Sequence, residues 1–168
     1  MGKEKLAYYG GNKTITKDFP WPLHTDKEIS ALKKVVESGT WGITPDPGSS
    51  VAVLERSFAS YLGVKHAVTA VNGSVALRLS LMAAGVRAGD EIIVPPMSFI
   101  ATASVVIEVN CVPVFVDIDP DTYNIDPCKI EEAITPRTKA IIPVHFGGNA
   151  CDMDLIMEIA AKHNLYVR

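Results

Sequence analysis

The sequence predicts an α/β protein whose mostly parallel sheet is covered by helices on both faces. From residue 66 onwards, short apolar runs of strand length alternate with longer segments in which apolar residues recur at helical spacing. Strands that alternate with helices form crossover units, and such units build parallel sheets. The 168 residues are 48% hydrophobic and 21% charged, which is enough apolar material for the core of one domain.

The N-terminal part is expected to form an arm followed by two amphipathic helices. Two prolines in residues 19–22 favour an extended path over the first 25 residues. Thr25 and Glu28 have the spacing of a capping box, which predicts a helix that ends at Gly39. A second helix is expected over residues 50–62, because its apolar residues again recur at helical spacing.

The remaining elements alternate along the chain. Strands are expected at residues 66–71, 91–94, 112–116, 140–144 and 165–167, and helices at residues 75–84, 100–109, 129–134 and 153–163. The helix over 75–84 is apolar nearly all round, which predicts that it is buried. Because the sequence stops at Arg168, we expect the sheet to be incomplete at its last strand.

Charge, cysteine content and missing motifs exclude several classes of protein. Sixteen Lys and Arg against nineteen Asp and Glu leave a net charge of −3, without the basic stripe of a nucleic-acid or anionic-membrane partner. The three cysteines form no Cys-x-x-Cys pair, so neither a disulfide framework nor a zinc site is expected. No nucleophile elbow, phosphate loop or dinucleotide fingerprint is present. With no apolar run near the roughly 20 residues that span a bilayer, we expect a cytoplasmic protein.

One candidate site lies where the first expected strand meets the apolar helix. Asn72, Gly73 and Ser74 form this junction, at the edge of the sheet where ligands bind in doubly wound folds. Free backbone N–H groups and the helix dipole favour an anion there. Gly73 would let a phosphate approach the backbone, and the Ser74 hydroxyl could add a hydrogen bond. The alternative is an ordinary Ser cap after a Gly turn.

Two further candidates follow neighbouring strands at the same edge. Phe99 comes after the strand at 91–94 and could stack on a flat heterocycle, or could be an ordinary core residue. His145 follows the strand that ends at Val144, as a site residue or as a hydrogen-bonded loop histidine. The acidic residues of 117–121 lack the glycine and glutamate of a calcium loop, so we expect them to cap turns and expect no metal.

Three segments, taken in order, resemble the DegT/StrS-type sugar aminotransferases. These enzymes use pyridoxal 5′-phosphate and have the aspartate aminotransferase fold, also called fold type I. The segments are residues 72–77, 89–103 and 113–126, and they are supported by residues 38–42, 135–145 and 152–154. The resemblance covers essentially the whole chain, and it implies the N-terminal part of the large domain of that fold.

The resemblance implies roles for individual residues. Gly73 and Ser74 fall on the positions that hold the cofactor phosphate, and Phe99 falls on the aromatic residue that stacks on the pyridine ring. Trp41 is implied to lie near the substrate or the dimer contact. His145 matches a family position to which no chemical role is attached.

The resemblance also implies the activity of the whole protein. It predicts a homodimeric aminotransferase that moves an amino group from glutamate or glutamine to a keto-sugar nucleotide or a keto-cyclitol, in polysaccharide or antibiotic biosynthesis. Residues 1–25 would be the arm, and residues 26–168 an incomplete cofactor-binding large domain.

The resemblance places no catalytic residue in this chain. In relatives, the aspartate that pairs with the ring nitrogen and the lysine that attaches the cofactor follow the strand at 165–167, so both would lie beyond Arg168. The chain alone is therefore expected to be inactive. Two alternatives stay open: a sugar dehydratase of the same family, in which histidine replaces that lysine, and a non-catalytic remnant that pairs with a full-length partner.

Overall fold

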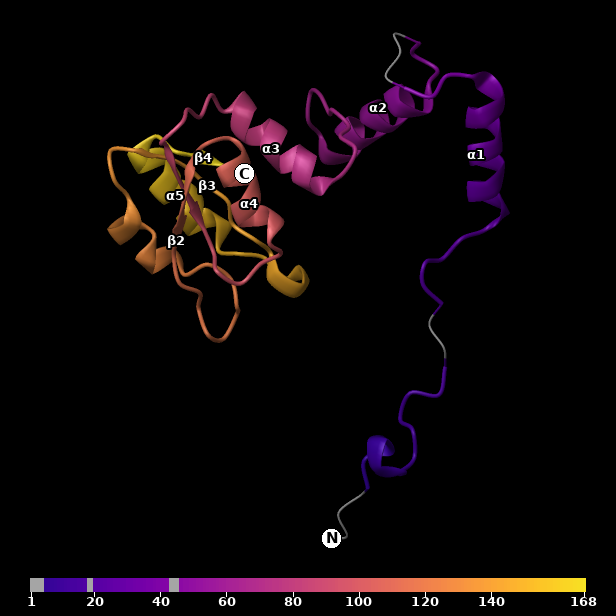
Figure 1. Cartoon of the computed structure of the whole chain (residues 1–168), viewed down its shortest axis with the longest axis horizontal. Helices are drawn as coiled ribbons and strands as arrows, with labels where there is room; N and C mark the ends of the chain where they lie inside the picture. Colours follow the sequence, from indigo (N-terminus) through magenta and orange to yellow (C-terminus); the bar gives the residue numbers. More distant parts are fainter. Residues whose placement is uncertain (1–4, 18–19, 43–45) are drawn as a thin grey trace. The chain divides into compact units, whose positions relative to one another are not determined.

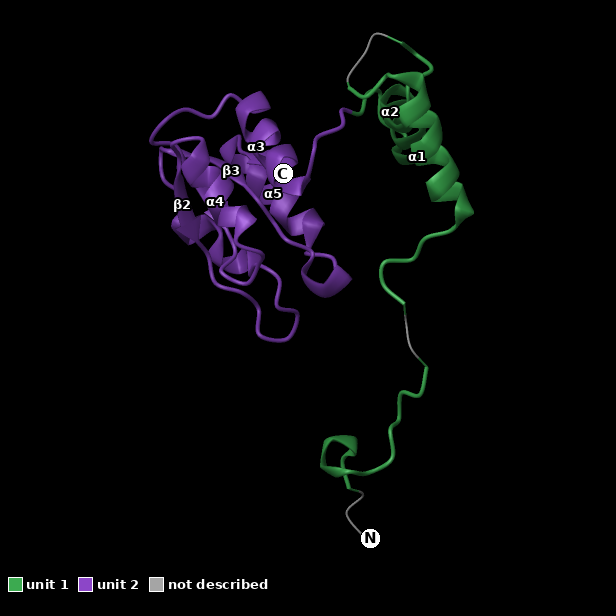
Figure 2. Ribbon diagram, turned by 45° about the vertical axis from the view of Figure 1, so that its right-hand side comes forward, with its two compact units in different colours: residues 1–67 green, residues 68–168 purple. Residues whose placement is uncertain are grey.

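The computed structural model describes residues 5–17, 20–42 and 46–168. The chain divides into two compact units, Met1–Ala67 and Val68–Arg168, which Figure 2 shows in different colours. None of the helices in the described ranges is long and apolar enough to cross a membrane.

The first unit carries two capped helices, α1 at Asp26–Ser38 and α2 at Ser50–Leu62 (Figure 1). The predicted capping box is confirmed, because the Thr25 side chain accepts from the α1 backbone while the Thr25 N–H donates to the Glu28 carboxylate at 2.7 Å. Ser49 caps α2 by accepting a hydrogen bond from the Ala52 N–H at 3.2 Å. Both predicted helices are therefore confirmed, including their boundaries.

The apolar faces of these two helices are largely exposed. Helix α1 has no buried residue, and Ala59 is the buried residue of α2. The exposed apolar side chains include Ile29, Leu32 and Val36 on α1, and Val53, Leu54, Phe58 and Leu62 on α2. An amphipathic helix gains its stability by packing this stripe against another element. Both helices therefore retain a surface that is suited to further packing.

The arm is not extended throughout. Residues Ala7–Tyr9 form a short 3₁₀ turn that the sequence did not predict, and the peptide bond between Trp21 and Pro22 is cis. Phe19, part of the segment expected to be extended, lies outside the described residues.

The second unit is built on a four-stranded parallel sheet. Its strands are β1 at Glu91–Val94, β2 at Val112–Phe115, β3 at Thr138–Ile141 and β4 at Tyr166–Val167. They lie in the order β2-β1-β3-β4, and each of the three pairings is parallel. The predicted α/β class with a parallel sheet is confirmed.

Helices cover the two faces of this sheet. They are α3 at Gly73–Ala83, α4 at Ala101–Glu108 and α5 at Met153–His163. One apolar core joins Ile93 and Ile141 of the sheet to α5, and a second core joins Ile92, Val94 and Ala140 to α3 and α4. Successive residues of a strand point to opposite faces, so the unbroken apolar run of β1 feeds both cores.

Two expectations for the start of this unit are wrong. Residues 66–71 form no strand, because a strand needs a hydrogen-bonded neighbour and no described strand pairs with them. Helix α3 is not buried: Leu81 is its buried residue, while Leu79 and Met82 are 43% and 58% exposed. Its apolar residues surround the helix, but only one side of it meets the second core.

Two further elements differ from expectation in form or boundaries. The helix expected at 129–134 is replaced by two 3₁₀ turns, Pro127–Lys129 and Glu131–Ala133, the usual form of such short connections. The strand expected at 140–144 is β3, which lies two to three residues earlier. Pro143 has no N–H with which to continue the ladder.

Candidate active site

The structure brings four of the five candidate residues to one cleft of the second unit. Gly73, Ser74, Phe99 and His145 all line this cleft, whose volume is about 1100 Å³. The cleft lies where the chain leaves β1 and β3, which is the carboxyl edge of the sheet. Trp41 belongs to the first unit, where its indole Nε1–H donates to the Val36 carbonyl at 3.3 Å, and its place near a site stays a prediction.

The N-terminus of α3 is capped by Asn72. The Asn72 Oδ1 accepts a hydrogen bond from the Val75 N–H at 2.9 Å, and the Asn72 carbonyl accepts from the Ala76 N–H at 3.0 Å. The alternative in which Ser74 is an ordinary cap is therefore wrong. The backbone N–H groups of Gly73 and Ser74 and the Ser74 hydroxyl have no hydrogen-bond partner among the described residues.

Nothing in the surrounding protein requires a glycine at position 73. Its φ lies outside the left-handed region, and apart from its chain neighbours and the backbone of its own helix no atom lies within 4 Å of the point where a Cβ would stand. A glycine in a helix costs roughly 0.5–1 kcal/mol relative to alanine. The missing side chain of Gly73 leaves open space beside the N–H groups of Gly73 and Ser74, on the side of the helix that lines the cleft.

Phe99 presents its ring to solvent at the cleft. The side chain is 75% exposed, so the alternative in which Phe99 is a core residue is wrong. Its backbone is held, because the Phe99 carbonyl accepts a hydrogen bond from the Thr102 N–H at 3.0 Å. The hydroxyl groups of Ser98 and Thr102, which flank Phe99 in the sequence, lie 2.6 Å apart.

His145 is held by the loop that follows β3. Its Nδ1 accepts a hydrogen bond from the Cys151 N–H at 3.1 Å. The expectation of a hydrogen-bonded loop histidine is confirmed, and His145 also lines the cleft, while its part in a site stays a prediction.

Asn124 is a positioning residue that sequence reasoning missed. Its Oδ1 accepts from the Phe146 N–H at 2.9 Å, and its Nδ2 donates to the carbonyls of Asn149 and Ala150 at 3.1 and 3.0 Å. Asn124 is 4% exposed, and its amide ties the loop before 126 to the loop that carries His145. The partners lie more than 20 positions away in the sequence, so no local pattern reveals them.

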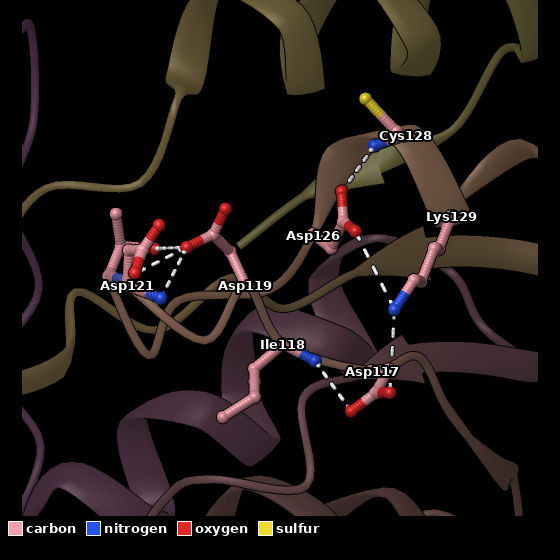
Figure 3. A network of polar contacts seen from close by, with 8 residues as sticks. Asp117, Ile118, Asp119, Asp121, Asp126, Cys128 and Lys129 are labelled. Carbon is pink, nitrogen blue, oxygen red and sulfur yellow. Dashed lines mark hydrogen bonds and ion pairs between the residues drawn. The ribbon is translucent and has the colours of Figure 1, made fainter.

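The acidic loop after β2 caps turns, as expected (Figure 3). Asp119 Oδ1 accepts from the N–H groups of Thr122 and Asp121 at 2.9 and 2.8 Å, and these bonds hold the pKa of the carboxyl below its usual range. Lys129 Nζ lies 3.4 Å from Asp117 and 3.7 Å from Asp126. The carboxylates of Asp117, Asp119 and Asp126 thus accept hydrogen bonds from backbone N–H groups of their own segment.

The rest of the cleft is mostly apolar. Its walls include Leu77, Ala101, Ile142, Val144, Met153, Met157, Leu165 and Val167. Arg168 is the charged side chain of the lining, and its Nε donates to the Ser80 carbonyl at 3.3 Å while its guanidinium lies 5.3 Å from the centre of the Tyr166 ring. No lysine, aspartate or glutamate is among the described residues of this lining.

Comparison with known proteins connects this site to one family. Residues 22–168 match the model of the DegT/DnrJ/EryC1/StrS aminotransferase family. A putative L-glutamine:3-amino-2,3-dideoxy-scyllo-inosose aminotransferase of Streptoalloteichus tenebrarius is 42% identical over 164 residues, which are 97% of this chain and 39% of that protein. The spore coat polysaccharide biosynthesis protein SpsC of Bacillus subtilis is 47% identical over 146 residues, which are 87% of this chain and 36% of SpsC.

A solved structure agrees with these sequence matches. NtdA from Bacillus subtilis, with its bound cofactor PMP, superposes with a TM-score of 0.79 at 37% identity, over 93% of this chain and 37% of NtdA. The chain therefore spans about two fifths of the length of the relatives it matches. At this level of identity, the likeness extends to sequence as well as fold.

Proposed function

Because this chain belongs to the DegT/DnrJ/EryC1/StrS aminotransferase family, we propose that its cleft binds pyridoxal 5′-phosphate. The whole protein would transfer an amino group from glutamate or glutamine to a keto-sugar nucleotide or a keto-cyclitol. Support for these substrates comes from relatives that act on an inosose or belong to polysaccharide biosynthesis.

The N-terminus of α3 is the single observation that carries this proposal. Because Asn72 performs the capping, the Ser74 hydroxyl and two backbone N–H groups stay available to an anion. Gly73 adds the space for a phosphate to reach these donors, although the protein's own packing does not require a glycine. Donors at a helix N-terminus suit a phosphate group, because the helix dipole adds positive potential there.

Phe99 would position the other end of the cofactor. Its ring is exposed at the same cleft, and an aromatic ring can stack on a pyridine. The cofactor, when bound, supplies an electron-withdrawing ring for the chemistry at the transferred nitrogen. The contribution of Gly73, Ser74 and Phe99 is to bind that ring system and fix its orientation.

We propose that the 168-residue chain binds the cofactor without catalysing amino transfer. Proton transfer at the substrate needs a general acid and base, and covalent attachment of the cofactor needs a lysine. The described lining of the cleft contains no lysine, aspartate or glutamate, and the chain is much shorter than its relatives. These observations favour a chain that provides the phosphate and stacking side of the site.

The organisation of the whole protein is also a proposal. Residues 1–25 would form an arm and residues 26–168 part of the cofactor-binding domain of a cytoplasmic homodimer. Support comes from the exposed apolar faces of α1 and α2, which a partner could cover. Trp41, which lies between these helices in the sequence, is also 74% exposed.

Calorimetric titration of the chain with pyridoxal 5′-phosphate tests the cofactor proposal. Removing a hydrogen bond to a charged phosphate in Ser74→Ala should weaken binding by roughly tenfold or more. Ser80→Ala is the matched control, because Ser80 lies on the same helix and in the same cleft lining. Equal affinities of the wild type and both variants, or no binding by the wild type, would contradict the proposal.

A second measurement tests the absence of catalysis. The chain is mixed with pyridoxal 5′-phosphate, treated with borohydride, digested and mapped by mass spectrometry. We expect no single lysine to be labelled in preference to the exposed ones. Stoichiometric labelling of one lysine, together with amino transfer from glutamate, would overturn the second proposal and leave the first intact.

A further inference from the structure

We propose that His145 donates a hydrogen bond from its Nε2–H to an oxygen atom on the ring end of the ligand in the cleft. This inference rests on the proposed function, because it names one more contact of the same ligand. It gives a chemical role to a residue whose position alone implied none.

The first step is the position of the imidazole proton. His145 Nδ1 lies 3.1 Å from the backbone nitrogen of Cys151, whose N–H donates to it. A ring nitrogen that accepts a hydrogen bond cannot carry a proton of its own. In the neutral ring, the proton is therefore on Nε2, and this nitrogen is a donor.

The second step is the rigidity of the loop that fixes this proton. The Asn124 amide makes three hydrogen bonds to backbone groups between positions 146 and 150, at 2.9 to 3.1 Å. The Cys151 thiol donates to the Val144 carbonyl at 3.2 Å, and burial raises the pKa of this thiol, which keeps it protonated. The loop is thus tied at both sides of His145, and the orientation of its ring is set before a ligand arrives.

The third step is the place of His145 relative to the other ligand contacts. Strands β1 and β3 pair directly, with Ile93 opposite Ile141. The chain leaves these neighbouring strands to reach Phe99 and His145, whereas the phosphate donors belong to α3. His145 therefore belongs with the residue that stacks on the ring.

The fourth step is the unused donor. Nε2 of His145 has no hydrogen-bond partner among the described residues, and the side chain lines the cleft. A pyridoxal ring carries a hydroxyl oxygen and an aldehyde oxygen, and both accept hydrogen bonds. A fixed, unpaired N–H in the same cleft as the exposed Phe99 ring suits such an oxygen, because no proton needs to move when the ligand binds.

Two substitutions separate this role from a structural one. In His145→Asn, the amide oxygen can take the place of Nδ1 and keep the bond to the Cys151 N–H, while the donor at Nε2 is lost. In His145→Gln, the longer side chain can place an amide N–H near the position of Nε2, while the acceptor for Cys151 is lost. Each variant therefore lacks the function of one ring nitrogen and keeps that of the other.

We expect each variant to lose a different property, which calorimetry measures as ligand affinity and thermal melting as stability. His145→Asn should melt like the wild type but bind pyridoxal 5′-phosphate roughly three- to tenfold more weakly, the effect of one hydrogen bond. His145→Gln should melt at a lower temperature and bind within about twofold of the wild type. If His145→Asn binds like the wild type, or if only His145→Gln loses affinity, the inference is wrong.

Two further measurements keep the inference and the proposed function distinguishable. Long-range ¹H–¹⁵N spectra of the neutral ring in the wild type should show the proton on Nε2, and a proton on Nδ1 would overturn the inference even if neither variant folds. Inorganic phosphate probes α3 alone, so its affinity should be the same in His145→Asn as in the wild type. Failure of the wild type to bind pyridoxal 5′-phosphate would overturn the proposed function itself.

Discussion

The hydroxyl groups of Ser98 and Thr102 lie 2.6 Å apart, one before and one after Phe99 in the sequence. Thr102 is buried, and its N–H also donates to the Phe99 carbonyl at 3.0 Å. Two contacts thus fix the backbone from which an exposed aromatic ring projects into the cleft. Although Thr102 also lines the cleft, this arrangement makes it a positioning residue for Phe99 in the proposed site.

Replacing Thr102 by valine should weaken binding of pyridoxal 5′-phosphate by roughly threefold, because one modest hydrogen bond no longer holds the loop. Inorganic phosphate, which has no ring, should bind as it does to the wild type. Thr102→Ser keeps the hydroxyl and is the matched control. Calorimetry with the two ligands measures the ratio, and equal losses for both ligands would point to general unfolding instead.

Replacing Gly73 by alanine should separate stability from binding. The variant should fold at least as stably as the wild type, because position 73 is helical and, outside its own helix and chain neighbours, no atom lies within 4 Å of the added Cβ. Affinity for inorganic phosphate should fall by roughly tenfold or more, since the methyl group occupies the approach to the free N–H groups. Urea denaturation measures the stability of the variant, and calorimetry measures its affinity for phosphate. Gly85→Ala is a useful contrast, because φ is +72° there and alanine is strained.

A phosphate affinity for Gly73→Ala equal to that of the wild type would show that the anion does not approach this residue. The proposed function would then lose the observation on which it mainly rests.

Replacing Asn124 by alanine should lower the free energy of unfolding by about 1–3 kcal/mol, because it removes three hydrogen bonds from a buried side chain to the backbone of the loop. Hydrogen exchange at the Phe146 amide should also accelerate, since Asn124 Oδ1 is its acceptor. Asn149→Ala is the control, because Asn149 is exposed and contributes its backbone carbonyl to Asn124. An unchanged exchange rate at Phe146 in Asn124→Ala would contradict this account of the loop.

Glu91 should make stability depend on pH in the acid range. Its carboxylate accepts hydrogen bonds from the Thr135 hydroxyl at 2.5 Å and from the Thr138 hydroxyl at 3.5 Å, and it pairs with Arg137. These contacts, that of Thr135 first, lower the pKa of Glu91 from its ordinary value of 4.5. A lowered folded-state pKa contributes stability that is present above pH 4.5 and is lost as the pH falls through the folded-state pKa.

Urea midpoints measured between about pH 3 and pH 6 should therefore fall toward acid, and less steeply in Glu91→Gln than in the wild type. Some slope should remain in the variant, because the pKa values of Asp117, Asp119 and Glu131 are also lowered. Identical slopes for the two proteins would rule out Glu91 as a source of the dependence.

Local signals in the sequence predicted much of this fold. The caps at Thr25 and Ser49 and the left-handed glycines at 39 and 63 fixed the ends of α1 and α2, because capping is decided within a few residues. The apolar run of β1 required burial on both faces, and the structure provides it. The clustering of Phe99 and His145 followed from a topological rule, since parallel strands end at the same edge. Gly73 and Ser74 line the same cleft, although no strand of the described sheet precedes them.

What the sequence did not predict depends on distant partners. Residues 66–71 have the composition of a strand, but a strand exists only where another one pairs with it. The exposure of α3 depends in the same way on how many of its sides meet another element. The amide of Asn124 and the carboxylate of Glu91 reach partners 22 or more positions away, beyond any local pattern.

The cap of α3 has a consequence for how this site can change during evolution. The Asn72 side chain caps the helix, and Ser74, two residues later, is the residue that we propose to contact the ligand. Substitution of Ser74, for example by threonine, can therefore change or abolish the affinity for an anion. Helix α3 would still fold, because its cap is Asn72. Capping of the helix and binding of the anion, which a single hydroxyl can combine, are here assigned to two residues. Each of the two residues can therefore change independently of the other.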